Sequence, residues 1–270
     1  MNPKGATGTA QRCPWHFGRA SEGGHYVSVR WTGGTVAIDD SVAMPNTVSG
    51  RTLRDSFWAD VESLTFGLAR RRGDSVCLGP FEMIRLGPAA VTRRGVKWPI
   101  EGGLLARAPG GRLRFETLYG RLVASVEGYQ PMLPRALYVL TQLPVHHLWT
   151  RMHLLRVRGR QPAPGVPVDP ATRLAAAVID AGVCIAVAAV AGRHRRLGVL
   201  LGFTAGYHVA CWSGSGRTLG GAIMKQRVVA VDGSRVTAGQ AALRLVALPL
   251  VALSRRNLHD EISGTDVVAD

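Results

Sequence analysis

The stretch "RLAAAVIDAGVCIAVAAVAG", residues 173–192, decides the fold class of this chain of 270 residues. From Leu174 to Ala191 it holds one charged side chain, Asp180, among eighteen residues. Helices of soluble proteins keep a polar face toward water, and this segment has none. A bilayer requires about 17 to 25 apolar helical residues. The stretch therefore predicts a membrane-spanning helix, and the alternative is a buried helix of a soluble bundle.

Two further apolar runs follow in the same third of the chain. Leu197–Trp212 contains one side chain that titrates near neutral pH, His208, and follows the short basic loop "GRHRR". Ala241–Leu253 is shorter and is interrupted by Arg244 and Pro249. The sequence thus predicts a membrane hairpin, with two to three short spans in all.

Asp180 needs a physical reason to lie within the first span, because an ionised carboxylate facing lipid is costly. Counting by three and four from Arg173 places Asp180 on a helix face of mostly small residues, which lets another helix approach closely. The members of this face are Ala176, Ala177, Asp180, Cys184, Val187, Ala188 and Ala191. We expect a basic partner on a neighbouring helix, either Arg244 or His208.

The sequence before the spans predicts a different kind of structure. Residues 24–160 contain short apolar segments separated by Gly and Pro, a pattern typical of antiparallel strands. Residues 133–160 change to helical periodicity, with Pro144 dividing the helix and Leu137, Leu140, Leu148, Met152 and Leu155 as its apolar stripe.

The predicted fold class is therefore α+β, with four segments. Residues 1–23 form a flexible tail without the apolar region of a signal peptide, and 24–160 form a β-rich soluble domain closed by one or two helices. Residues 161–172, with four prolines, form a stiff linker, and 173–270 form the helical membrane domain.

The net charge of +15 favours an anionic membrane surface or anionic lipid headgroups as partners. The basic residues form no block of five, so no specific nucleic-acid binding is expected. The four cysteines have no metal-ligand spacing, and no nucleotide loop or catalytic triad is present. We expect no metal, no cofactor and no enzymatic activity.

"GSGRTLGG" (214–221) lacks the Lys-Ser/Thr pair of a phosphate loop and predicts a tight turn.

Two groups of polar side chains have an ordinary and a functional interpretation. His146, His147 and His153 lie on one predicted helix, where a polar helix edge is favoured over a metal site. His259, Asp260 and Glu261 are adjacent, where capping of a short turn is favoured over acid-base catalysis.

The last third of the chain resembles the RDD family of bacterial membrane proteins, named for one arginine and two aspartates. The motifs are "RLAAAVID", "GRTLGGAIMKQRVVAVDGSRVTAGQAALR" and "NLHDEISGTDVV", within about residues 170–268. Arg173, Asp180 and Asp260 match the three named residues, and Arg244 fits the opening of the third segment. The short loop "GRHRR", and Ala222 where a basic residue is common, depart from the family pattern.

The resemblance implies an integral, multi-pass protein of the bacterial inner (plasma) membrane, in which transport of an ion or small solute has been suggested. We expect a polar intramembrane cluster of Arg173, Asp180, Arg244 and Asp260, with His208 and His259 as partners, that fixes helix packing or carries the solute. The alternative is a membrane-anchored ligand- or lipid-binding protein whose β-rich domain carries the function. Positive charge flanking the first span favours a cytoplasmic N-terminal domain. Because three short spans make a thin pore, we also expect a homo-oligomer.

Overall fold

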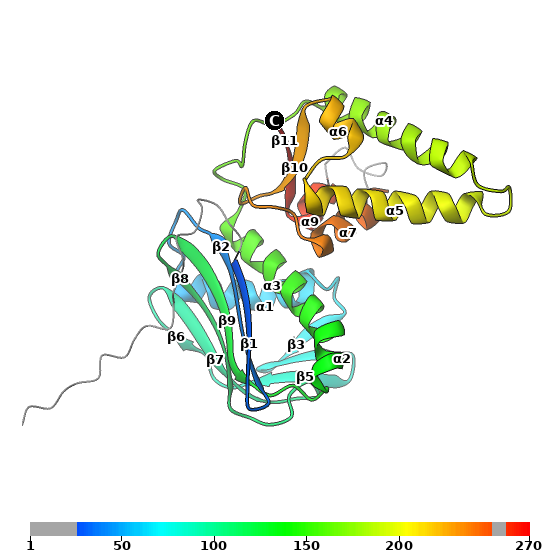
Figure 1. The fold of residues 1–270 in the computed structure, drawn as a ribbon. Helices are drawn as coiled ribbons and strands as arrows, with labels where there is room; N and C mark the ends of the chain where they lie inside the picture. The colour runs from blue at the N-terminus through cyan, green and yellow to red at the C-terminus, as the bar shows by residue number, and fades with distance from the viewer. Residues whose placement is uncertain (1–25, 250–257) are drawn as a thin grey trace, which may run out of the picture.

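The computed structural model describes residues 26–249 and 258–270, so the expected tail of residues 1–23 lies outside the described part. The described residues form an N-terminal antiparallel sheet with helices, followed by a mainly helical C-terminal region (Figure 1). The α+β class and the β-rich first half are therefore confirmed. The C-terminal region also contains a two-stranded antiparallel sheet.

The N-terminal sheet has nine described strands in the order β1-β2-β9-β8-β7-β5-β4-β3, with β6 paired to β7. All of these pairs are antiparallel, and the strands are consecutive along most of the sheet. The strands are β1 (Tyr26–Thr32), β2 (Thr35–Ala43), β3 (Ala69–Arg72), β4 (Ser75–Leu78), β5 (Phe81–Leu86), β6 (Ala90–Val91), β7 (Gly95–Gly102), β8 (Gly111–Leu118) and β9 (Arg121–Tyr129). Alternation along β7 buries Val96, Trp98 and Ile100 on one face.

Helix α1 (Gly50–Ser63) was not predicted from the sequence, although it carries helical signals. Ser49 is its N-cap, and the Ser49 hydroxyl accepts a hydrogen bond from the backbone N–H of Thr52 at 3.1 Å. Leu53, Phe57 and Val61, spaced by four, are buried against the sheet. The cap and this spacing are visible in the sequence, and packing on the sheet stabilises the helix that they favour.

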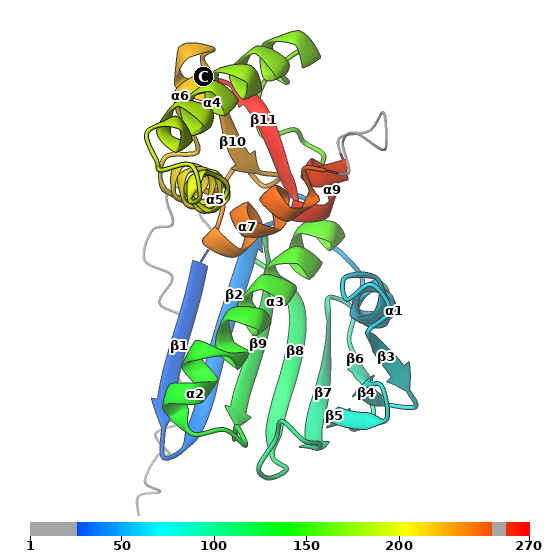
Figure 2. The same cartoon turned by 90° about the vertical axis from the view of Figure 1, so that its right-hand side faces the viewer.

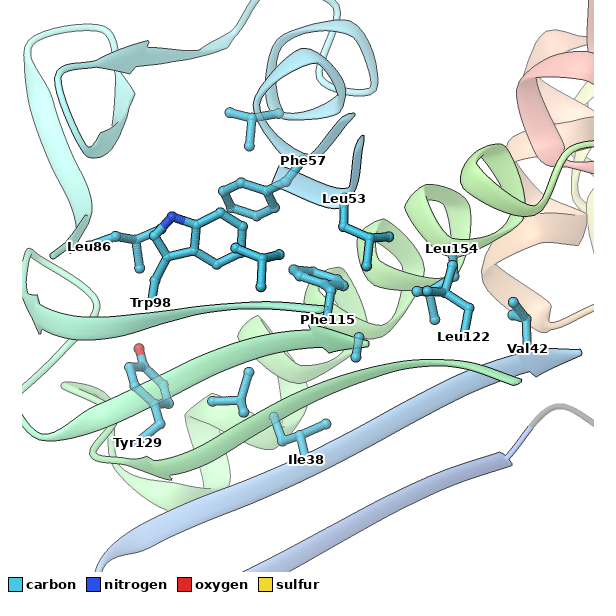
Figure 3. Packing of buried hydrophobic residues seen from close by; sticks show 14 of the residues in the cluster. Ile38, Val42, Leu53, Phe57, Leu86, Trp98, Phe115, Leu122, Tyr129 and Leu154 are labelled. Atoms are coloured by element: carbon cyan, nitrogen blue, oxygen red, sulfur yellow. The ribbon is translucent and has the colours of Figure 1, made fainter. Parts of the chain in front are cut away.

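Helices α2 (Arg135–Leu140) and α3 (Gln142–Arg158) lie on the concave face of the curved sheet (Figure 2). Phe57 packs against Trp98 at 4.9 Å and Phe115 at 5.7 Å between ring centroids, and Leu154 of α3 joins the same core (Figure 3). Sheet and helices thus enclose one apolar interior.

The predicted division of this helical segment is confirmed, but the break lies at Thr141 rather than at Pro144. Pro144 instead occupies the first turn of α3, where a backbone N–H has no partner within the helix. Of the predicted apolar stripe, Met152 and Leu155 are buried, whereas Leu137 and Leu140 are exposed, so that part of the prediction was wrong.

The C-terminal region begins with α4 (Pro170–Ala189) and α5 (Arg196–Gly214), which pair as a hairpin (Figure 1). Asp169 caps α4 by accepting from the backbone N–H groups of Ala171 and Thr172. The remaining described elements are α6 (Leu219–Ile223), β10 (Gln226–Ala230), α7 (Ala238–Ala247), α9 (Leu258–Ser263) and β11 (Thr265–Ala269).

Among the described helices, α4 alone has the length and apolar composition of a membrane span. Helix α5 covers the second predicted run, but four glycines, Arg196 and His208 lower its hydropathy. The third run begins in α7, a helix of ten residues that buries Arg244, and residues 250–253 lie outside the described part. The described part of the chain therefore contains one helix that has both the length and the composition of a membrane span, and two or three spans are not shown.

Residues 161–169 of the predicted linker form no helix, whereas residues 170–172 already belong to α4. The linker also contacts the C-terminal region. The backbone N–H of Ala269 donates to Val166 O at 2.9 Å, and Pro167 forms an isolated bridge with Val268. The linker therefore continues the small β10-β11 sheet along its β11 edge.

The two halves of the chain are joined by a buried ion pair. Arg151 of α3 is 1% exposed, and it donates to both Asp232 carboxylate oxygens, at 3.1 and 3.3 Å, and to the Ser234 hydroxyl at 2.5 Å. Ala230 and Val231, beside this pair, belong to the apolar core of the N-terminal half. The C-terminal region is thereby fixed against α3.

We predict that Arg151→Met lowers the free energy of unfolding by about 3–5 kcal/mol, because the Asp232 carboxylate stays buried without its partner. Urea unfolding of the full chain in mild detergent, followed by tryptophan fluorescence, measures the change. Arg112→Met, at an exposed position of β8, is the matched control and should have an effect within about 0.5 kcal/mol. Equal effects of the two variants would show that the ion pair does not hold the halves together.

Candidate functional site

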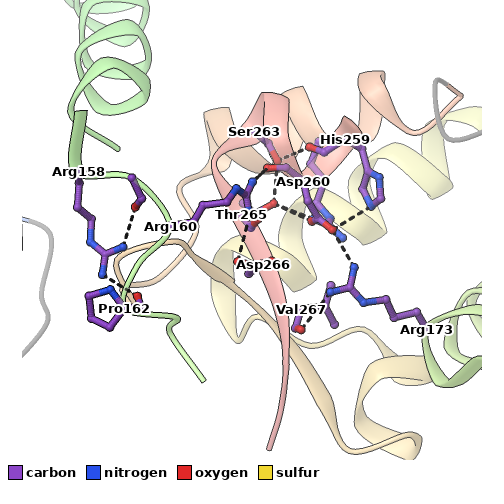
Figure 4. A network of polar contacts seen from close by, with 12 residues as sticks. Arg158, Arg160, Pro162, Arg173, His259, Asp260, Ser263, Thr265, Asp266 and Val267 are labelled. Atoms are coloured by element: carbon purple, nitrogen blue, oxygen red, sulfur yellow. Dashed lines mark hydrogen bonds and ion pairs between the residues drawn. The ribbon is translucent and has the colours of Figure 1, made fainter. Parts of the chain in front are cut away.

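Three of the four residues predicted to form a polar cluster come together. Asp260 of α9 accepts from Arg173 of α4 at 3.0 Å through one carboxylate oxygen, and Arg244 of α7 contacts the other oxygen (Figure 4). The Thr265 hydroxyl donates to the second oxygen at 3.1 Å and accepts from Arg244. One buried carboxylate thus ties the start of α4 to α7, α9 and β11.

A third arginine extends this network toward the N-terminal half. Arg160 donates to the backbone carbonyl oxygen of Asp260 at 2.9 Å and forms an ion pair with Asp266 at 3.1 Å (Figure 4). Burial, together with Arg244 and Arg173, lowers the pKa of His259 to about 4, so this side chain is neutral near pH 7. Three guanidinium groups therefore meet two carboxylates, and the network has an excess of one positive charge.

Asp180 does not belong to this cluster, so the prediction that it does was wrong. The expected partner of its carboxylate was Arg244 or His208, but neither forms a hydrogen bond with it in the structure. Its Oδ1 accepts from the Tyr207 hydroxyl and from the backbone N–H of Gly220, both at 2.8 Å. Asp180 is 5% exposed, so the requirement for a partner was correct. The partners are a phenol and a backbone amide, which neighbouring segments supply only after α5 and α6 have packed on α4.

The "GRTLGG" motif now has a structural explanation. A Cβ atom on Gly220 would lie 2.2 Å from the backbone oxygen of Ala176, so only glycine allows α6 to approach α4. The same approach brings the Gly220 N–H to Asp180. The predicted tight turn is present at Ser215 and Gly216, where Gly216 has a φ of 77°, and it leads into the short helix α6, which is capped by Thr218 and holds the Asp180 carboxylate.

The small-residue face predicted for the first span is confirmed. The buried residues of α4 are Ala176, Asp180, Cys184 and Ala188, one helical turn apart. The other faces of α4 expose Leu174, Val178 and Ile185. Within the described residues, His208 of α5 forms no hydrogen bond with α4. Its Nδ1 lies 2.9 Å from the carbonyl oxygen of Thr204 in its own helix.

A cavity of about 1270 Å³ lies between α4, α5, α7 and β10. Its walls include five of the six predicted residues, namely Arg173, Asp180, His208, Arg244 and His259. Most of the remaining wall is apolar, with Leu201 and Ile185 of the two long helices among the residues. The predicted residues therefore share one cavity, although they do not form one hydrogen-bonded cluster.

The histidines of α3 have carboxylate partners in the N-terminal half. His147 Nδ1 lies 3.0 Å from Asp40, and His153 Nδ1 lies 2.8 Å from Asp60. Burial raises the pKa of Asp60, but His153 and Arg156 together outweigh this and lower it. Within residues 26–249 and 258–270, no three His, Cys, Asp or Glu side chains are placed to hold a metal ion.

A second cavity, of about 480 Å³, lies inside the N-terminal half, and the sequence analysis did not locate it. It is bounded by α1, the sheet and the first half of α3, and its walls are almost entirely apolar. The lining residues include Ile38, Phe57, Val61, Thr65, Ala69, Val76, Met83, Ile84, Leu113, Phe115, Tyr138, Gln142, Val145 and Trp149. The strand patterns in the sequence gave no sign that the helices and the sheet leave space between them.

Gln142 is the unusual member of this lining. Its amide nitrogen and amide oxygen are both buried, and neither has a hydrogen-bond partner. Leaving a buried polar group unpaired costs about 1–3 kcal/mol. Beside this apolar cavity, the Gln142 amide is therefore a polar group that the described protein leaves without a hydrogen-bond partner.

Comparisons of the chain with known protein families, with curated proteins and with solved structures found no match. The similarity to the RDD family therefore stays a prediction from the sequence motifs.

We predict that Asp260→Asn lowers the free energy of unfolding by about 3–5 kcal/mol, since Arg173 and Arg244 keep their buried charges without a counterion. Asp266→Asn is the matched control, because Asp266 pairs with Arg160 where both side chains are partly exposed, and it should cost about 1 kcal/mol or less. Urea unfolding of the full chain compares the two. A larger loss for Asp266→Asn would contradict the central role of Asp260.

Proposed function

We propose that this protein binds an apolar, lipid-like ligand in its N-terminal half and is anchored in the bacterial plasma membrane by the α4–α5 hairpin. The observation that carries the proposal is the apolar cavity of about 480 Å³ between the sheet and α3. Its volume lies within the range of about 300–1,000 Å³ that small-molecule sites have.

The chemistry of the cavity wall indicates the class of ligand. Large apolar cavities do not hold ordered water, because water needs two to four polar partners. Gln142 supplies one donor and one acceptor that are unpaired. A ligand with a hydrocarbon body and a single hydroxyl, ester or carboxyl group satisfies both parts of the site.

The anchor is supported by the exposed faces of the hairpin. Leu174, Val178 and Ile185 of α4, and Leu197 and Leu201 of α5, are exposed large apolar side chains. Monomeric soluble proteins rarely expose contiguous apolar surface of this kind. Insertion of the hairpin into a bilayer buries these side chains, and the basic residues that precede α4 favour a cytoplasmic N-terminal half.

We predict that Ala69→Phe, which fills the cavity from β3, reduces the amount of ligand that co-purifies with the full chain. Ala90→Phe, at an exposed position of β6, is the matched control and should leave that amount unchanged. The chain is extracted in polymer-bounded lipid discs, so that no detergent fills the cavity. Mass spectrometry of the organic extract then compares each variant with wild type.

The expected result is a species that is enriched over the disc lipids for wild type and Ala90→Phe and depleted for Ala69→Phe. An extract that is identical for all three chains would contradict ligand binding in this cavity.

A second candidate function is the transport of an ion or small solute through the C-terminal region. The cavity of about 1270 Å³ beside Arg173, Asp180 and Arg244 supports it. Ionisable groups within a membrane region are candidates for solute or proton pathways. On this proposal the Asp180 carboxylate would act in addition to holding Tyr207 and Gly220.

Asp180→Asn separates the structural role from the transport role. We predict that the variant folds, because an amide oxygen also accepts from Tyr207 and Gly220, whereas Asp180→Leu loses both bonds and unfolds more easily. Ion uptake is measured in proteoliposomes with dyes for H⁺, Na⁺ and K⁺. Transport that depends on the carboxylate charge is lost in Asp180→Asn; uptake equal to wild type, or no uptake by wild type, contradicts the second candidate.

A further inference from the structure

The cavity in the N-terminal half opens at one side. Val145 of α3 lines the cavity and is nevertheless 68% exposed, so it marks the mouth. Thr141 and Gln142 line the cavity on the same helix, and Thr65 and Ala69 line it from the end of α1 and the start of β3. The mouth therefore lies between the first turns of α3 and the α1–β3 connection.

Exposed apolar side chains adjoin, in the sequence, the residues that line this mouth. Phe66 and Leu68 lie in the α1–β3 connection, and Leu140, at the end of α2, is 74% exposed. We call Phe66, Leu68, Leu140 and Val145 the apolar rim. These residues come from two segments about seventy positions apart in the sequence, and each segment contributes residues to the lining of the cavity.

The elements that carry the apolar rim lie on the side of the N-terminal half toward which the hairpin extends. In Figure 2 α5 is seen along its axis, and α2, the first half of α3, α1 and β3 lie on the side of the N-terminal half that faces the viewer. In Figure 1 the joined ends of α4 and α5 point to the right, and α2 lies at the right of the N-terminal half. The Arg151–Asp232 ion pair holds the two halves in this relation.

Positive charge accompanies the rim. Arg70, Arg71 and Arg72 of β3 follow Leu68 after a single residue, Ala69, and all three are exposed. Only Arg71 among them has a carboxylate within ion-pair distance in the described part of the chain, at Asp74. An apolar surface bordered by arginines is complementary to a membrane that contains anionic lipids.

We propose that the apolar rim rests on the membrane in which the hairpin is inserted, and that the cavity takes its ligand, a lipid with a small polar head, directly from that leaflet. This inference rests on the proposed function, and it adds the source of the ligand and its route. Entry through the rim keeps a hydrocarbon chain out of water, which avoids the free-energy cost of exposing it.

Three valine-to-cysteine variants test the inference, because a label at each position reports whether lipid acyl chains come close to it. Val145→Cys reports on the rim, and Val190→Cys, at an 87% exposed position after α4, reports on the hairpin. Val91→Cys is exposed on β6, which Figure 1 shows on the side away from the hairpin end. Each full-length variant, with the native cysteines replaced by alanine, carries a small fluorophore and is reconstituted in bilayers of phosphatidylcholine and phosphatidylglycerol with brominated acyl chains.

We expect brominated lipid to quench the labels at Val145 and Val190, and to leave the label at Val91 unchanged. A quenched Val190 label beside an unquenched Val145 label would overturn the membrane contact of the rim, and the co-purification test of the cavity would be unaffected. A Val145 label that is shielded from aqueous iodide but not quenched by brominated lipid would show that protein covers the rim, which also overturns the inference. Unquenched labels at both Val145 and Val190 would contradict the insertion of the α4–α5 hairpin in the membrane as well.

Discussion

The buried ion pair between Arg151 and Asp232 determines what the two halves of this protein can do together. Arg151 lies in the middle of the helix that closes the apolar cavity, and Asp232 lies in the turn that follows β10. Burying two charges is costly, and their attraction compensates only when the geometry is good and further hydrogen bonds are made. The bidentate contact and the Ser234 hydroxyl meet that condition. The direction of the hairpin relative to the cavity is fixed as a result.

The acidic groups of the C-terminal region have a structural role, because they join separate segments of that region. Asp260 draws Arg173 and Arg244 from two helices onto one carboxylate, and Asp180 holds the N-terminus of the short helix α6. Both carboxylate oxygens of Asp260 accept from neighbouring donors, and Oδ1 of Asp180 accepts from two. A binding role is assigned first to the N-terminal cavity, where both polar atoms of the Gln142 amide are without a hydrogen-bond partner.

Helix α3 connects the two functions that we propose. Its first turns line the cavity and its mouth, its middle carries Arg151, and its last residues lead into the linker beside β11. A change in the position of α3 would therefore alter the size of the cavity and the orientation of the hairpin together. The cavity and the hairpin are coupled in this way because one rigid helix contacts both of them.

The sequence by itself determined the local features that depend on periodicity and composition. Apolar and small residues at helical spacing defined α4 and the face that buries Asp180, and Gly-separated strand patterns defined the antiparallel half. It also placed Arg173, Arg244 and Asp260 in one cluster, although only through the resemblance of motifs.

Tertiary structure decided what depends on contacts between distant segments. The partners of Asp180 come from α5 and α6, and the sheet buries the apolar face of α1. The cavity exists because α3 and the sheet leave space between them, which is a property of their separation and not of any one stretch. The two rim segments border the same cavity for the same reason, since a sequence gives the spacing of residues along the chain, whereas burial depends on the distances between segments.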